Sequence, residues 1–99
     1  MNIVVVTACP TGIAHTYMAA EQLEKTAKAL GHNIKVETQG AMGIENVLSA
    51  KDIREADVAI FAVGIEVEQR ARFEGKKIIE VEVQAAIKDP QAVFEKLDR

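Results

Sequence analysis

The chain has 99 residues, of which 48% are hydrophobic and 27% charged, and this composition is typical of one small soluble domain, here residues 1–99. The formal net charge of −3 argues against nucleic-acid binding, which requires a clustered basic surface. The longest apolar run, residues 58–65, is too short to enter a bilayer, and the N-terminus lacks the basic start of a signal peptide.

The first half of the chain predicts a strand, a helix and a second strand. Ile3–Val6 is an unbroken apolar run, as expected of a strand covered on both faces of a sheet. Apolar residues then recur at helical spacing over residues 14–30, which predicts an amphipathic helix that Gly31 ends. Residues 34–38 alternate between apolar and polar side chains, so we expect an edge strand there.

The second half begins with a predicted helix at Ser49, where Asp52 three residues later suggests a weak capping box. Residues 58–63 form another apolar run and predict a second central strand. The remaining expected elements are a short helix near residues 68–73 that ends at Gly75, an edge strand over residues 77–81, and a helix that Asp89 caps, Pro90 opens and Leu97 closes.

This alternation of strands and helices predicts an α/β fold, a Rossmann-like three-layer sandwich with helices on both faces of a parallel sheet. Right-handed crossovers and two central apolar strands give four strands in the order 2-1-3-4. The order reverses between strands 1 and 3, and ligands of open α/β sheets bind at carboxyl strand ends beside such a reversal. Cys9 directly follows strand 1 and therefore lies at the predicted binding place.

The functional reading depends on the turn between the first strand and the first helix. A thiol there faces unpaired backbone N–H groups and the positive end of a helix dipole, which bind anions and lower the pKa of a cysteine. The segment therefore predicts a nucleophile, Cys9, within a phosphate-binding loop that continues through Pro10, Thr11, Gly12, Ile13, Ala14, His15 and Thr16.

Several roles in this loop remain open on sequence alone. A lone cysteine is more often a small buried apolar residue, but the Pro10-Thr11-Gly12 run after Cys9 is typical of a turn. The threonines are either cap residues or hydroxyl donors to a phosphate, and His15 is either exposed without a role or a hydrogen-bond donor. The single Cys excludes an internal disulfide and fits a reducing cytoplasm; neither a metal site nor a cofactor is expected.

The spacing Cys-x5-His-Thr resembles the Cys-x5-Arg-Ser/Thr loop of tyrosine phosphatases, with His15 in the place of the arginine. Without that guanidinium, backbone N–H groups must carry the binding, and the loop should accept phosphate but hydrolyse it poorly, as a carrier requires. A low-molecular-weight phosphatase-like hydrolase is the alternative, with Asp89 as its general acid unless this residue is only a helix cap. A flavin-binding domain is a third class, disfavoured because only 4% of residues are aromatic.

The chain also resembles the fructose-type IIB domain of the bacterial phosphoenolpyruvate-dependent sugar phosphotransferase system. The similarity covers nearly the whole chain and is most specific over residues 6–21. It extends to the runs Val36-Glu37-Thr38-Gln39-Gly40, Gly43-Ile44-Glu45-Asn46, Arg72-Phe73 and Gly75-Lys76.

This resemblance implies a cytoplasmic phosphotransferase that acts through a phosphocysteine at Cys9. The thiolate would accept the phosphoryl group from a phosphohistidine of the IIA component and pass it to a sugar, by family type fructose, held by the membrane-embedded IIC permease. Transfer between proteins requires an exposed docking face, for which residues 40–46 and 64–70 are the expected neighbours. Family members often have an acidic residue near position 64, and Gly64 departs from this pattern.

Overall fold

The computed structural model describes residues 1–9, 13–40 and 43–98. The strands are β1 (Asn2–Ala8), β2 (Asn33–Gly40), β3 (Gly43–Glu45), β4 (Val58–Val63) and β5 (Ile78–Val81). The helices are α1 (Ile13–Ala29), α2 (Ala50–Glu55), α3 (Val83–Lys88) and α4 (Pro90–Glu95), with the 3₁₀ turns η1 (Arg70–Phe73) and η2 (Lys96–Asp98).

The sheet has the order β3-β2-β1-β4-β5. Its four parallel strands confirm the predicted order, with β1 between β2 and β4. The prediction of only four strands was wrong, because β3 adds a fifth strand antiparallel to β2. At three residues, and beginning with a glycine, β3 is too short to show any alternation in sequence.

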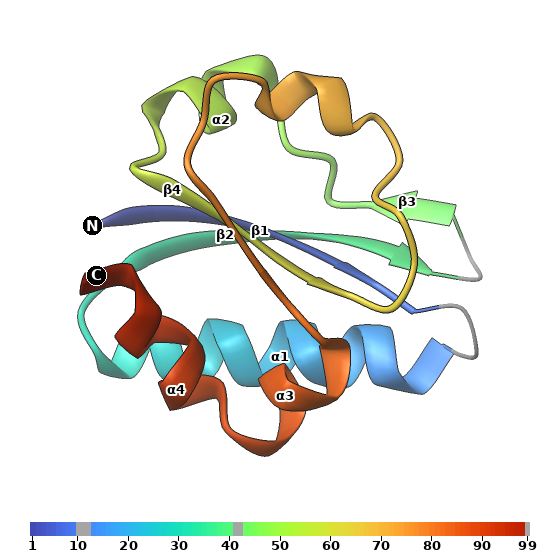
Figure 1. Cartoon of the computed structure of the whole chain (residues 1–99), viewed down its shortest axis with the longest axis vertical. Coiled ribbons are helices and arrows are strands. Elements are labelled where there is room, and N and C mark those ends of the chain that lie inside the picture. Colours follow the sequence, from blue (N-terminus) through green and yellow to red (C-terminus); the bar gives the residue numbers. More distant parts are fainter. Residues whose placement is uncertain (10–12, 41–42, 99) are drawn as a thin grey trace.

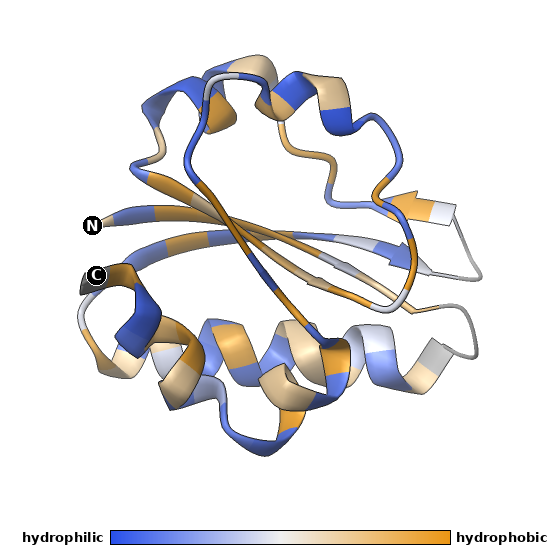
Figure 2. Ribbon diagram, viewed as in Figure 1, coloured by the Kyte–Doolittle hydropathy of each residue, from blue (hydrophilic) through white to orange (hydrophobic). Residues whose placement is uncertain are grey.

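The structure has three layers, with α1, α3 and α4 on one face of the sheet and α2 and η1 on the other (Figure 1). Figure 2 shows hydrophobic colour along β1 and β4 between these layers. Successive residues of β1 point to opposite faces, so Val5 packs beneath α1 while Val4 and Val6 pack beneath α2 and η1. Both faces of the central strands are therefore buried, as their unbroken apolar runs predict.

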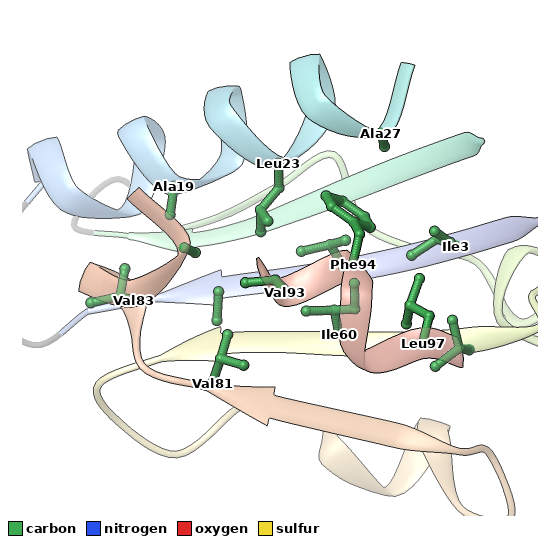
Figure 3. Close-up of a cluster of buried hydrophobic side chains, with 14 residues drawn as sticks. Ile3, Ala19, Leu23, Ala27, Ile60, Val81, Val83, Val93, Phe94 and Leu97 are labelled. Atoms are coloured by element: carbon green, nitrogen blue, oxygen red, sulfur yellow. The ribbon is translucent and has the colours of Figure 1, made fainter. Parts of the chain in front are cut away.

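The α1 face holds the larger cluster of buried apolar side chains (Figure 3). Leu23 of α1 and Phe94 of α4 both point into it, and each is at most 3% exposed. Helix α1 starts and ends one residue earlier than predicted. Gly31 follows it with a φ of +83°, the left-handed conformation that glycine adopts without strain.

The predicted helix starts in the second half are also confirmed. Ser49 and Asp52 form a reciprocal capping box at α2, and Asp89 caps α4 with Pro90 in its first turn. The short helix expected near residues 68–73 is the 3₁₀ turn η1. The α3 helix was missed, since its six residues give too few turns for a helical period to be recognised.

Candidate functional site

Cys9 is the first residue after β1 and lies at the carboxyl edge of the sheet. In the strand register, Ala8 has Gln39 of β2 on one side and Val63 of β4 on the other. The amide of Gly64 donates to the carbonyl of Ala8 at 2.7 Å. Cys9 is half-buried and packs against the apolar cluster on the α1 face, so its thiol lies between the strand ends and the head of α1.

His15, in the first turn of α1, brings its imidazole to this thiol. Cys9 Sγ and His15 Nδ1 are 3.9 Å apart, and both side chains are partly buried. His15 is therefore not an exposed residue without a contact, which was one of the two sequence-based readings. The first turn of α1 has no acidic residue, so the positive end of the helix dipole is not neutralised beside the sulfur atom.

Among the predicted site residues, the structure brings Cys9 and His15 into contact. Thr16, the next residue of α1, is fully buried, and Ala14 is exposed. The helix begins at Ile13. The predicted loop residues that lie outside the described part of the chain are Pro10, Thr11 and Gly12.

A second contact ties the next turn of α1 to the edge of the sheet. The Tyr17 hydroxyl donates to Glu45 Oε1 of β3 at 2.5 Å. This hydrogen bond, followed by partial burial and the negative charge of Glu45, raises the pKa of Tyr17 above its usual 10.0. A side chain at Gly40 would place its Cβ 3.4 Å from the Tyr17 hydroxyl, so glycine allows the end of β2 to lie close to α1.

A buried ion pair on the opposite face of the sheet was not recognised in the sequence. Glu37 of β2 is fully buried, and its two carboxylate oxygens accept from Arg72 Nη1 and Nη2 at 2.8 and 2.9 Å. The Leu48 amide and the Gln39 side chain donate to the same carboxylate at 2.9 and 2.8 Å. Burial alone would raise the pKa of Glu37, but these hydrogen bonds outweigh it and lower the pKa below 4.5.

Arg72 uses every nitrogen of its guanidinium group in this network. Besides Glu37, it donates to the main-chain carbonyls of Gln69 from Nε, of Leu48 from Nη1 and of Glu68 from Nη2, over 3.0 to 3.4 Å. The pair with Glu37 raises its pKa, so the guanidinium stays charged. The network connects strand β2 with two loops that lie far apart in the sequence.

A cleft of about 740 Å³ opens at the carboxyl edge, beyond β4 and β5. Its walls include Gly64, Ile65 and Glu66 after β4, and Arg70, which pairs with Glu80 of β5 at 3.2 Å. Across residues 1–9, 13–40 and 43–98, no three His, Cys, Asp or Glu side chains gather as metal ligands would. None of the helices in these same ranges has the length and apolar character needed to cross a membrane.

Comparison with known proteins identifies the family. The model of the family "PTS system, Lactose/Cellobiose specific IIB subunit" matches residues 4–96, nearly the whole chain. The chain belongs to the IIB family of the phosphotransferase system. It is 49% identical over 97 residues to the "PTS system fructose-like EIIB component 2" of Escherichia coli K12, with 98% of this chain and 92% of that protein covered.

Two further relatives place this IIB chain within the fructose type. It is 50% identical over 99 residues to the "Fructose-like PTS system EIIBC component" of Escherichia coli K12, of which it spans only 20%. The solved structure of a domain of fruA from Bacillus subtilis is 48% identical and has a TM-score of 0.88, with 97% of this chain and 91% of that one covered. The chain is thus a fructose-type IIB phosphoryl carrier, and the fold inferred above is that of solved relatives.

In this IIB chain, Asp89, the general acid of the phosphatase alternative, is a helix cap. The Asp89 carboxylate accepts from the Ala92 amide at 3.2 Å as the cap of α4. This contact confirms the helix-cap reading of the Asp89-Pro90 pair. The carboxylate has a structural partner of its own, as a capping residue requires.

Proposed function

We propose that Cys9 is the residue on which this IIB chain carries the phosphoryl group. The Cys9 thiolate attacks phosphorus, the N–P bond of a IIA phosphohistidine breaks with its electron pair left on the imidazole, and an S–P bond forms. A hydroxyl of a sugar held by the IIC permease then attacks the same phosphorus and gives up its proton, and the S–P bond breaks with its electron pair left on the Cys9 thiolate. Fructose is the sugar we expect, because similar proteins are named fructose-like components.

The observation that carries this assignment is the placement of the Cys9 thiol at the head of α1, 3.9 Å from His15. Unpaired amides of the first helical turn attract an anion, and they favour both a thiolate and a phosphate bound to it. His15 donates a hydrogen bond from its imidazole to the sulfur or to a phosphate oxygen. We assign the residues from Pro10 to Thr16 to the cradle around that phosphate.

The chemistry of this cradle favours carriage over hydrolysis. The sequence contains no Lys or Arg before Lys25, so no guanidinium from the loop itself stabilises the charge that develops when water attacks. Backbone amides bind the phosphoryl group, and the S–P bond survives until the proper acceptor arrives. This is the behaviour that a carrier between two proteins requires.

We assign exposed apolar side chains at the carboxyl edge of the sheet to the docking face that transfer between proteins needs. Met18, one helical turn after His15, is 47% exposed, and Ile65, next to Gly64, is 42% exposed. Met18 lies in the same helix as His15 and Ile65 in the loop after β4, so we assign both to the apolar area that a transient partner contacts. Because the EIIBC relative joins a IIB domain to a IIC component, we place the chain at the cytoplasmic face of the membrane, in contact with IIC.

The test is phosphate uptake from IIA that carries radiolabelled phosphate on its histidine, compared between wild type, Cys9→Ala and the control His32→Gln. We expect stable label on wild type and on His32→Gln, none on Cys9→Ala, and loss of label when membranes with IIC and fructose are added. His15→Ala should accept label more slowly. Label on Cys9→Ala, or rapid release of inorganic phosphate by wild type without sugar, would contradict the proposal.

A further inference from the structure

We propose that Gln39 is a positioning residue for phosphoryl transfer, because it holds residues 64–69 beside Cys9. The ion pair between Glu37 and Arg72 in turn holds Gln39. The inference rests on the proposed role of Cys9 and adds a group that never touches the reacting atoms. It gives a function to the buried network of Glu37, Arg72 and Gln39 on the face of the sheet opposite α1.

The Gln39 side chain binds both main-chain polar groups of one residue, Glu68, in the segment after β4. Its Oε1 accepts from the Glu68 amide at 2.9 Å, and its Nε2 donates to the Glu68 carbonyl at 3.2 Å. Two hydrogen bonds between one side-chain amide and one residue's main chain fix both the distance and the orientation of that residue. Gln39 is only 6% exposed, so water does not readily replace these bonds.

The link passes directly beneath the residue that precedes the nucleophile. Gln39 is the register partner of Ala8, and neighbouring residues in parallel strands point to the same face. The Gln39 side chain therefore crosses the face beneath Ala8 on its way to Glu68, where the small, fully buried Ala8 side chain leaves room for it. Since Gly64 also bonds to the Ala8 carbonyl, the segment is tied to the end of β1 at Gly64 and to the end of β2 at Glu68.

Glu37 sets the direction in which the Gln39 amide points. A carboxylate only accepts hydrogen bonds, so Glu37 Oε2 requires the NH₂ group of Gln39 on its side, at 2.8 Å. The Oε1 atom of Gln39 then faces the Glu68 amide and accepts from it. Arg72 keeps Glu37 ionised through its two-pronged contact. The negative charge of Glu37, which Arg72 maintains, thus determines the orientation of the Gln39 side-chain amide.

The segment does not hold this conformation by local preference alone. Gln69 has a φ of +59°, in the left-handed region that costs energy for a residue with a side chain. Its carbonyl accepts from Arg72 Nε at 3.0 Å, and the neighbouring Glu68 carbonyl accepts from Arg72 Nη2 at 3.4 Å. The network therefore stabilises a strained turn, and its loss should let residues 64–69 relax away from Cys9.

Such a shift matters for transfer because the segment begins at Gly64, which is bonded to the residue before Cys9, and because it carries Ile65, which is 42% exposed and available to a partner. A displacement of about 1 Å in a positioning group lowers rates by up to about a hundredfold. The maximal transfer rate should therefore respond to the network even though the thiol itself is unchanged.

The experiment compares wild type with Gln39→Met, which removes both bonds to Glu68 and keeps the side-chain length. Lys35→Met is the matched control, since Lys35 lies on the same strand and face but pairs with Asp52 at the surface. For each, we would measure the maximal rate and KM of Cys9 phosphorylation by phospho-IIA, amide hydrogen exchange, and thermal unfolding.

We expect Gln39→Met to stay folded at the assay temperature, to exchange faster over residues 64–69, and to lose about tenfold or more in maximal rate. Lys35→Met should match wild type. If Gln39→Met does not fold, Arg72→Lys serves instead, because it keeps the charge but lacks the forked donor set. Faster exchange with a transfer rate within about twofold of wild type would overturn the inference, as would unchanged exchange. Label on Cys9→Ala would instead refute the proposed function. The same assay therefore distinguishes failure of the proposed function from failure of the role of Gln39.

Discussion

Arg72→Met tests how much the buried ion pair contributes to the fold. Among the residues that the structure describes, the substitution leaves Glu37, which has no exposed surface, with the Leu48 amide and the Gln39 side chain as its partners. Removing one member of a buried pair costs about 3–5 kcal/mol, because the remaining charge stays desolvated. In a domain of this size, each kcal/mol lowers the melting temperature by roughly 4–8 °C.

The pH dependence of this loss identifies Glu37 as its source. In wild type, the pKa of Glu37 is lowered below 4.5, so its contribution is present above pH 4.5 and is lost as pH falls through the folded-state pKa. In Arg72→Met, burial raises the pKa of Glu37 above 4.5 instead, and the variant becomes more stable as pH falls. The difference in unfolding free energy between the two proteins should therefore be largest at pH 7 and shrink toward pH 4.5.

Urea unfolding followed by circular dichroism measures this difference at several pH values between 4.5 and 7. The double variant Glu37→Gln/Arg72→Met has no buried charge and should be more stable at pH 7 than Arg72→Met alone. Lys35→Met, which breaks an exposed pair, should leave the free energy of unfolding close to that of wild type. A stability difference that is the same at pH 4.5 and pH 7 would refute the reasoning.

Two further predictions use other elements of the fold. The only tyrosine of this tryptophan-free chain, Tyr17, should titrate above pH 10 by ultraviolet absorbance, and Glu45→Ala, which removes the acceptor, should return its midpoint toward 10; equal midpoints in the two proteins would rule out the hydrogen bond as the cause. Leu23→Ala should lower the free energy of unfolding by about 2–5 kcal/mol, because Leu23 is fully buried beneath α1. Leu30→Ala, at a 46% exposed position, is its control in the same denaturation series.

The features that were predictable from sequence are those encoded by neighbouring residues. The apolar run of β1, the helical period of α1 and the turn between them are contiguous, and they place Cys9 at the strand end without any knowledge of the rest of the fold. The capping pair of Ser49 and Asp52 is local in the same way. A strand as short as β3 carries no such local signal, since its pairing with β2 decides its conformation.

The support of the site was not predictable because its parts are distant in sequence. Glu37 and Arg72 are 35 residues apart, and the alternating pattern around Glu37 is equally that of an edge strand with a solvated polar face. The structure instead buries this face under Arg72 and the loops at Leu48 and Glu68. Only the tertiary fold shows that a carboxylate on β2 is desolvated and needs a partner.

The placement of the arginines also explains why a loop with phosphatase-like spacing serves a carrier. A phosphatase stabilises the developing charge with a guanidinium beside its thiol. Here Cys9 packs on the α1 face of the sheet, whereas Arg72 is bound to Glu37 on the other face with every nitrogen engaged. Arg70 lies over the Phe61 ring at 5.0 Å and pairs with Glu80. Neither arginine replaces the missing loop guanidinium, so in the proposed mechanism we expect the phosphate on Cys9 to be held by backbone amides and His15 and to hydrolyse slowly.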